Sequence, residues 1–95
     1  MTTQNFKDSL QEASVPSGLN DIQQALWFEG KGDWQKAHDL IQDNKDSKSA
    51  WIHAYLHRKE GDTFNAQYWY TQAGRKMPDM TLQQEWEEMV KIFVG

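Results

Sequence analysis

Residues 25–37, Ala25-Leu-Trp-Phe-Glu-Gly-Lys-Gly-Asp-Trp-Gln-Lys-Ala37, have a counterpart 29 positions later in residues 54–66, Ala54-Tyr-Leu-His-Arg-Lys-Glu-Gly-Asp-Thr-Phe-Asn-Ala66. Both copies begin and end with alanine and carry Gly-Asp between the two. Glycine ends a helix in the left-handed conformation, and aspartate caps the helix that follows. Repetition on this scale is typical of stacked helical hairpins. The repeat therefore predicts two tight helix pairs, with the small alanines allowing close approach.

Capping signals and apolar spacing extend this prediction to the whole chain. Asn20 with Gln23, and Thr81 with Gln84, match the capping box that opens a helix. No segment alternates as a strand does. We therefore expect an all-α protein with two antiparallel helix pairs, an α-α superhelix fragment, and a C-terminal capping helix. The predicted bounds are about 20–43 for hairpin 1, 47–76 for hairpin 2 and 82–93 for the last helix.

The N-terminal segment is less well defined by its residues. Residues 1–18 are polar and end in a turn-rich connector, so we expect them to be partly flexible and residues 19–95 to form a single helical-repeat domain. Phe6 and Leu10 lie four apart, which permits a short helix over about 5–12 that either docks or frays. We expect these side chains of the fourth predicted helix to face inward: Phe64, Ala66, Trp69, Tyr70 and Ala73. We expect three acids of the last helix to be solvated: Glu85, Glu87 and Glu88.

Composition narrows the classes of partner. The net charge is −4, so the basic excess of a nucleic-acid-binding protein is missing. There is no cysteine, which removes disulfides and thiolate metal sites from consideration. The first residues lack the apolar core of a signal peptide, and no window approaches the roughly 20 apolar residues of a membrane span. We expect a cytoplasmic protein without nucleic-acid or membrane partners.

The second copy of the repeat resembles the tetratricopeptide repeat family, and the first copy does so less completely. The matching positions of the second copy are Trp51, Ala54, Gly61-Asp62, Ala66, Tyr70, Ala73 and Pro78. The offset of 29 residues is shorter than the family's usual repeat of about 34. The stretch from Trp51 to Tyr70 is also similar to a group of small bacterial proteins without an assigned activity.

This resemblance implies a concave groove that holds a peptide of a partner protein. Carried onto this sequence, the groove positions are Ile22, Leu26, Glu29, Trp51, Tyr55, Arg58 and Lys59. Aromatic and arginine side chains of this kind dominate many binding hot spots. In the alternative arrangement, the last helix folds back over the groove, and Trp51 and Tyr55 become part of the core.

Two histidines raise a second possibility. His53 and His57 are four residues apart and share a helix face, a spacing used for zinc ligands. The nearest candidates for a third ligand are His38, Glu60 and Asp62. Because the His-Glu-x-x-His pattern is missing, we favour structural or surface histidines and expect no metal. A metal site at His53 and His57 remains the alternative.

No nucleophile motif, phosphate loop or dinucleotide fingerprint is present in the sequence. We therefore expect a protein-binding or peptide-binding interaction module with no catalytic activity and no cofactor. Two alternatives stay open: a small metal- or ligand-binding protein that uses His53 and His57, and a homo-oligomer. The last follows because stacked repeats expose apolar end faces that a second copy can cover.

Overall fold

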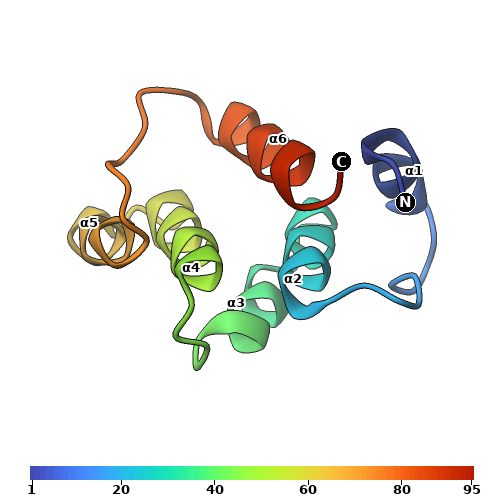
Figure 1. Cartoon of the computed structure of the whole chain (residues 1–95), viewed down its shortest axis with the longest axis horizontal. Coiled ribbons are helices and arrows are strands. Elements are labelled where there is room, and N and C mark those ends of the chain that lie inside the picture. Colours follow the sequence, from blue (N-terminus) through green and yellow to red (C-terminus); the bar gives the residue numbers. More distant parts are fainter.

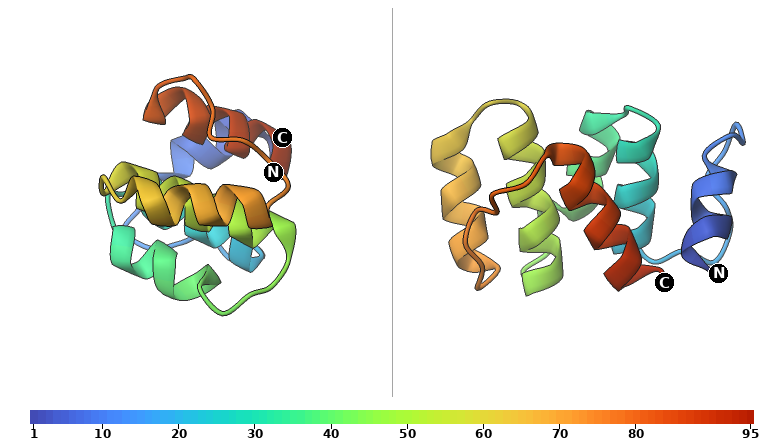
Figure 2. Two further views of the ribbon diagram at one scale, coloured as in Figure 1. Left: turned by 90° about the vertical axis from the view of Figure 1, so that its left-hand side faces the viewer. Right: turned by 90° about the horizontal axis from the view of Figure 1, so that it is seen from above.

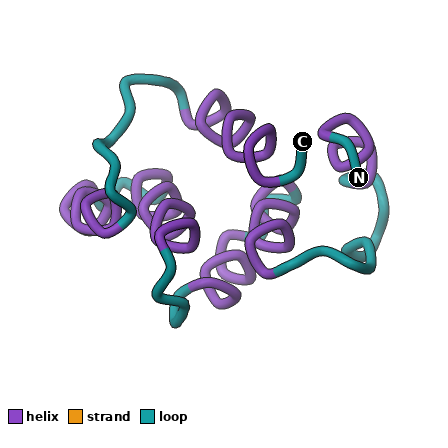
Figure 3. Tube along the Cα trace, viewed as in Figure 1, coloured by secondary structure: helices purple, strands orange, loops and turns teal.

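The computed structural model describes all residues, 1–95, and contains helices and no strand (Figures 1 and 3). The protein is therefore all-α, as the sequence predicts. The helices are α1 (Thr3–Ser9), α2 (Asp21–Gly30), α3 (Trp34–Ile41), α4 (Ser47–Lys59), α5 (Thr63–Gln72) and α6 (Leu82–Phe93).

The helix starts follow the capping residues of the sequence. The side chain of Asn20 accepts a hydrogen bond from the backbone of Gln23, whose side chain bonds back, and Thr81 and Gln84 form the same capping box for α6. Asp33, Asp46 and Asp62 cap α3, α4 and α5.

The repeated Gly-Asp step has a direct conformational cause. Gly32 and Gly61 have φ angles of +83° and +85°, a region that residues with a Cβ atom rarely adopt. Each glycine lets the chain reverse within two residues of a helix end, so that the following aspartate is placed to cap the next helix.

The two hairpins, α2–α3 and α4–α5, lie side by side through contacts between α3 and α4 (Figure 2). The repeated alanines sit where the paired helices meet, and none of the four has any exposed surface: Ala25, Ala37, Ala54 and Ala66. Small side chains at these positions allow the helix backbones to pack closely, which explains why alanine recurs in both copies.

Two further helices cover one side of this arrangement. α6 crosses α2 and α4 (Figure 1), and α1 docks beside it through Phe6, which is fully buried and lies 6.4 Å from Trp86 between ring centroids. Trp27 donates to Ser9 Oγ at 3.1 Å, which also ties α1 to α2. The observed bounds of α1, Thr3–Ser9, begin and end somewhat earlier than the predicted range of 5–12.

The prediction that Phe64 faces inward is wrong. Phe64 is 83% exposed, because α5 is the outer helix of the second hairpin and packs mainly against α4. In the same helix, Ala66 and Tyr70 are buried as predicted. No helix is long and apolar enough to span a membrane; the longest, α4, has 13 residues.

Candidate functional site

The groove predicted from the family resemblance lies beneath α6. Leu26, Trp51 and Tyr55 are 0%, 4% and 3% exposed, and Ile22 is half-buried. They are covered because α6 presents its own apolar stripe, Trp86, Met89 and Val90, to α2 and α4. The open groove is therefore wrong for this structure, and the covered arrangement is confirmed: the C-terminal helix occupies the concave face, and Trp51 and Tyr55 belong to the core.

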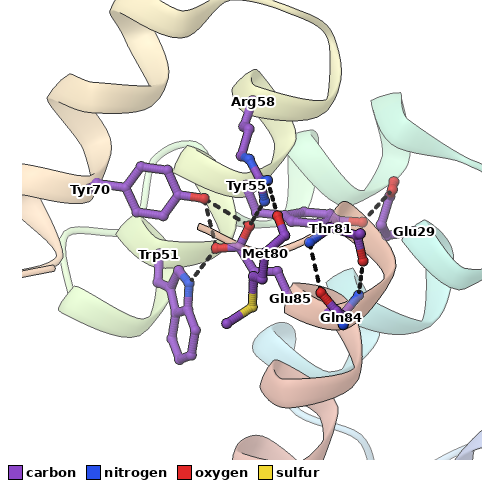
Figure 4. Close-up of polar contacts among 9 residues, drawn as sticks. All are labelled: Glu29, Trp51, Tyr55, Arg58, Tyr70, Met80, Thr81, Gln84 and Glu85. Carbon is purple, nitrogen blue, oxygen red and sulfur yellow. Dashed lines mark hydrogen bonds and ion pairs between the residues drawn. The ribbon is translucent and has the colours of Figure 1, made fainter. Parts of the chain in front are cut away.

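α6 is held there by a buried carboxylate (Figure 4). Glu85 is fully buried and accepts hydrogen bonds from Trp51 Nε1 at 3.0 Å and from Tyr70 OH at 2.6 Å. Arg58 Nη1 lies 2.8 Å from its other oxygen and completes an ion pair. The expectation that Glu85 is solvated is wrong. The sequence carried a signal, because Glu85 falls on the same face as Leu82, Trp86 and Met89.

Glu29, a second acid of the predicted groove, is also buried, at 4% exposure. Its Oε1 pairs with the ammonium of Lys59 and lies 3.4 Å from the hydroxyl of Tyr55. Burial, together with the charge of Glu29, raises the pKa of Tyr55, so the phenol stays protonated and donates to the carboxylate. The predicted groove residues thus divide into a covered apolar set and two polar clusters around Glu85 and Glu29.

The histidines form a separate cluster on the other side of α4. His38 comes from α3, and His53 and His57 lie one turn apart on α4. Each ring offers a ligand nitrogen, and these three nitrogens all lie within 4.8 Å of one another. The Nε2 atoms of His38 and His53 are 3.1 Å apart. Of the three candidates for a third ligand, His38 is therefore the one that lies close to both His53 and His57.

Two tryptophans hold the rings in place. Trp69 of α5 stacks on His53 with 4.0 Å between ring centroids, and Trp34 of α3 stacks on His38 at 4.9 Å. Trp34 is itself fixed, because its Nε1 donates to the carbonyl of Leu56 at 2.8 Å. The cluster therefore occupies the seam where α3, α4 and α5 meet, with its rings oriented by packing rather than by solvent.

Burial keeps two of these histidines neutral. Burial, reinforced by the neighbouring His38 and His57 rings, lowers the pKa of His53 to about 4. The pKa of His38 is lowered by burial and by His57, against the opposing charges of Asp39 and Glu60. At neutral pH both imidazoles are therefore uncharged and each carries one lone pair, as a metal-ligating histidine must.

A carboxylate flanks the cluster. Glu60 Oε1 lies 2.5 Å from Nδ1 of His57, which leaves Nε2 of that ring free to act as a ligand. A metal-ligating histidine often donates its other ring N–H to a carboxylate, which fixes the orientation of the ring. Asp62 lies near the same two residues, so that His57, Glu60 and Asp62 form a second potential ligand set.

One atom of the cluster lacks a partner. Nδ1 of His38 is buried and makes no hydrogen bond. Buried polar atoms are nearly always satisfied in folded proteins. His38 thus has one ring nitrogen without a partner, while its Nε2 lies beside Nε2 of His53. Imidazole nitrogens at that separation are suited to binding a metal cation.

Comparison with models of protein families, with characterised proteins and with solved structures gave no significant match.

Proposed function

We propose that the protein binds a divalent transition-metal ion through His38, His53 and His57. The observation that carries this proposal is the convergence of three imidazoles from two helices, with their ligand nitrogens within 4.8 Å of one another. This is the metal-binding alternative that the sequence analysis left open for His53 and His57, with His38 of the other hairpin as the third ligand.

The donor set indicates the class of metal. Imidazole nitrogen suits zinc, copper and nickel, whereas magnesium and calcium prefer oxygen ligands. In a tetrahedral zinc site with bonds of about 2.0–2.1 Å, two nitrogens lie about 3.3 Å apart. The 3.1 Å between the Nε2 atoms of His38 and His53 is close to that spacing. Three protein ligands leave one position for water or a further ligand, and Glu60 would orient His57.

The test is a titration of untagged, metal-free protein with Zn²⁺ by calorimetry, and with Co²⁺ by its visible absorption. We expect one ion per chain and a four-coordinate cobalt spectrum. His38→Gln, His53→Gln and His57→Gln should each weaken binding by more than about 100-fold, and Glu60→Gln by about 10- to 100-fold, the usual effect of losing an outer-shell partner.

The second ligand set provides the matched control. Asp62→Asn keeps the cap of α5, since asparagine is as good a cap as aspartate, and should leave zinc affinity unchanged. If Asp62→Asn abolished binding while His38→Gln and His53→Gln bound as the unaltered chain does, the ion would lie on His57, Glu60 and Asp62. The proposed site would then be wrong.

The outer face of α5 favours a second function, that of an interaction module. All ten residues of α5 are uncharged, although charged residues make up 25% of the chain, and Phe64 and Tyr68 are 83% and 54% exposed one turn apart. Interface centres are typically depleted in charge and enriched in aromatic residues.

The partner that fits this face best is a second copy of the chain in antiparallel orientation. The acidic Glu60 precedes α5 and the basic Lys76 follows it, so antiparallel pairing places opposite charges together at both ends. The acidic net charge also makes an uncharged face the place where two copies repel least. Weak self-association is the expected behaviour.

A further inference from the structure

A pocket of about 300 Å³ lies at one end of the predicted groove, beside the start of α6. Its walls come from α2, α4, the start of α6 and the segment after α1. The lining side chains are Leu10, Glu29, Tyr55, Lys59, Gln83 and Trp86. None of these residues belongs to the histidine cluster, so the pocket is independent of the proposed metal site.

Glu29 is the one acidic residue in the wall of the pocket. Its side chain is 2% exposed, and Oε2 is buried without any hydrogen-bond partner. Only Oε1 is engaged, by Lys59 and by the hydroxyl of Tyr55. A buried carboxylate with one oxygen unsatisfied is costly, because the full desolvation penalty of that oxygen is not recovered.

The position of Glu29 along the chain is unfavourable as well. It lies in the last turn of α2, so its negative charge sits at the negative end of the helix dipole. That turn contains no basic residue to offset the charge. Violations of local rules of this kind concentrate at functional sites in natural proteins. A cation next to Oε2 would offset both the missing hydrogen bond and the dipole.

The surrounding side chains define what kind of cation fits. Trp86 and Leu10 form an apolar wall, and aromatic faces attract ammonium groups. Lys59 already places an ammonium on Oε1, but its side chain is 40% exposed and enters from the rim. A metal ion is disfavoured because the pocket offers a single carboxylate.

We propose that this pocket binds a small organic primary amine in its protonated form. The carboxylate of Glu29 turns toward the pocket on binding, so that Oε2 accepts from the ammonium, and the carbon chain of the ligand lies against Trp86 and Leu10. The ammonium of Lys59 competes with the ligand, because it already forms an ion pair with the carboxylate that the ligand binds. The proposal extends beyond metal binding, and its failure would leave the histidine site unaffected.

The test is an NMR titration of the full chain with n-butylamine at neutral pH, following the backbone amides of Gly30 and Gly32, which line the pocket. We expect saturable shifts with n-butylamine and none with 1-butanol or butyrate. Glu29→Gln should abolish the shifts. Lys59→Met should tighten binding about two- to fivefold, the range expected from removing a partly exposed ion pair.

Lys7→Met is the matched control, because Lys7 also forms a partly exposed ion pair, with Glu87, but lies away from the pocket. It should leave amine affinity unchanged. Equal binding of 1-butanol, retained binding in Glu29→Gln, or weaker binding in Lys59→Met would each overturn the proposal. The amine-against-alcohol comparison and Lys59→Met decide the question even if Glu29→Gln does not fold.

Discussion

Two buried glutamates show that the neighbouring side chains decide whether a buried carboxylate has hydrogen-bond partners for both of its oxygens. Glu29 and Glu85 both lie on the apolar face of an amphipathic helix, and both are almost fully buried. Glu85 is satisfied on both oxygens by tryptophan, tyrosine and arginine, whereas Glu29 has one oxygen without a partner. The first therefore contributes to the fold, and the second is a candidate for ligand binding.

His53 makes the stability of the protein depend on pH. Its pKa is lowered from 6.5 to about 4, so between these values the unfolded chain binds a proton that the folded chain does not. Stability is therefore complete above pH 6.5 and is lost as the pH falls toward 4. Between pH 6.5 and 5, we expect the free energy of unfolding in urea, with a chelator present, to fall by about 1.5 kcal/mol.

His53→Gln supplies the comparison for this prediction. Because glutamine does not titrate, the variant should lose most of the decrease between pH 6.5 and 5, and His38 should account for the remainder. An unchanged pH profile in His53→Gln would show that the pKa of His53 is the same in the folded and unfolded chains.

At the scale of the element, the docking of α6 depends on one carboxylate. Glu85→Gln keeps the shape of the side chain but leaves Arg58 without its ion-pair partner and removes a charged acceptor from Tyr70 and Trp51. Breaking a buried pair in this way costs about 3–5 kcal/mol. We expect a loss toward the lower end of this range in urea denaturation, because Arg58 is 20% exposed.

Glu87→Gln is the control on the same helix. Glu87 pairs with Lys7, and both side chains are more than 30% exposed, so the change should cost at most about 1 kcal/mol. If the two variants were equally stable, the buried network around Glu85 would not be what holds α6 against α4 and α5.

At the scale of the whole molecule, the two ends of the helical stack differ. α1 and α6 cover the side of α2, while the outer face of α5 is left open (Figure 1). Sedimentation equilibrium over increasing protein concentration should therefore show a weak monomer–dimer equilibrium. Phe64→Glu and Tyr68→Glu should shift it to monomer, and Lys76→Glu should weaken it by losing the charge pairing at the ends.

Ile92→Glu is the control for the dimer prediction. Ile92 is 54% exposed, as Tyr68 is, but it lies on α6. The variant should associate as the unaltered chain does. A protein that stays monomeric at all concentrations, or one whose dimer is lost in Ile92→Glu but not in Phe64→Glu, would contradict the assignment of α5 as the interface.

The candidate site was only partly predictable. The spacing of His53 and His57 on one helix is local information, and it predicts their shared face. His38 lies on a different hairpin, so its position depends on how α3 packs against α4, which no spacing records. Glu29 and Glu85 carried a local signal, since both fall on apolar stripes, but the partners that make burial of a charge tolerable come from other helices.

The sequence by itself determined the elements and their pairing. Capping residues, the two glycines with positive φ and the repeated alanines act within a few positions of one another, so their effects follow from local geometry. Only the tertiary structure decided that α6 closes the groove, that Phe64 faces outward and that three histidines meet. These outcomes depend on which apolar surfaces are buried against one another and on which buried charges find partners far along the chain.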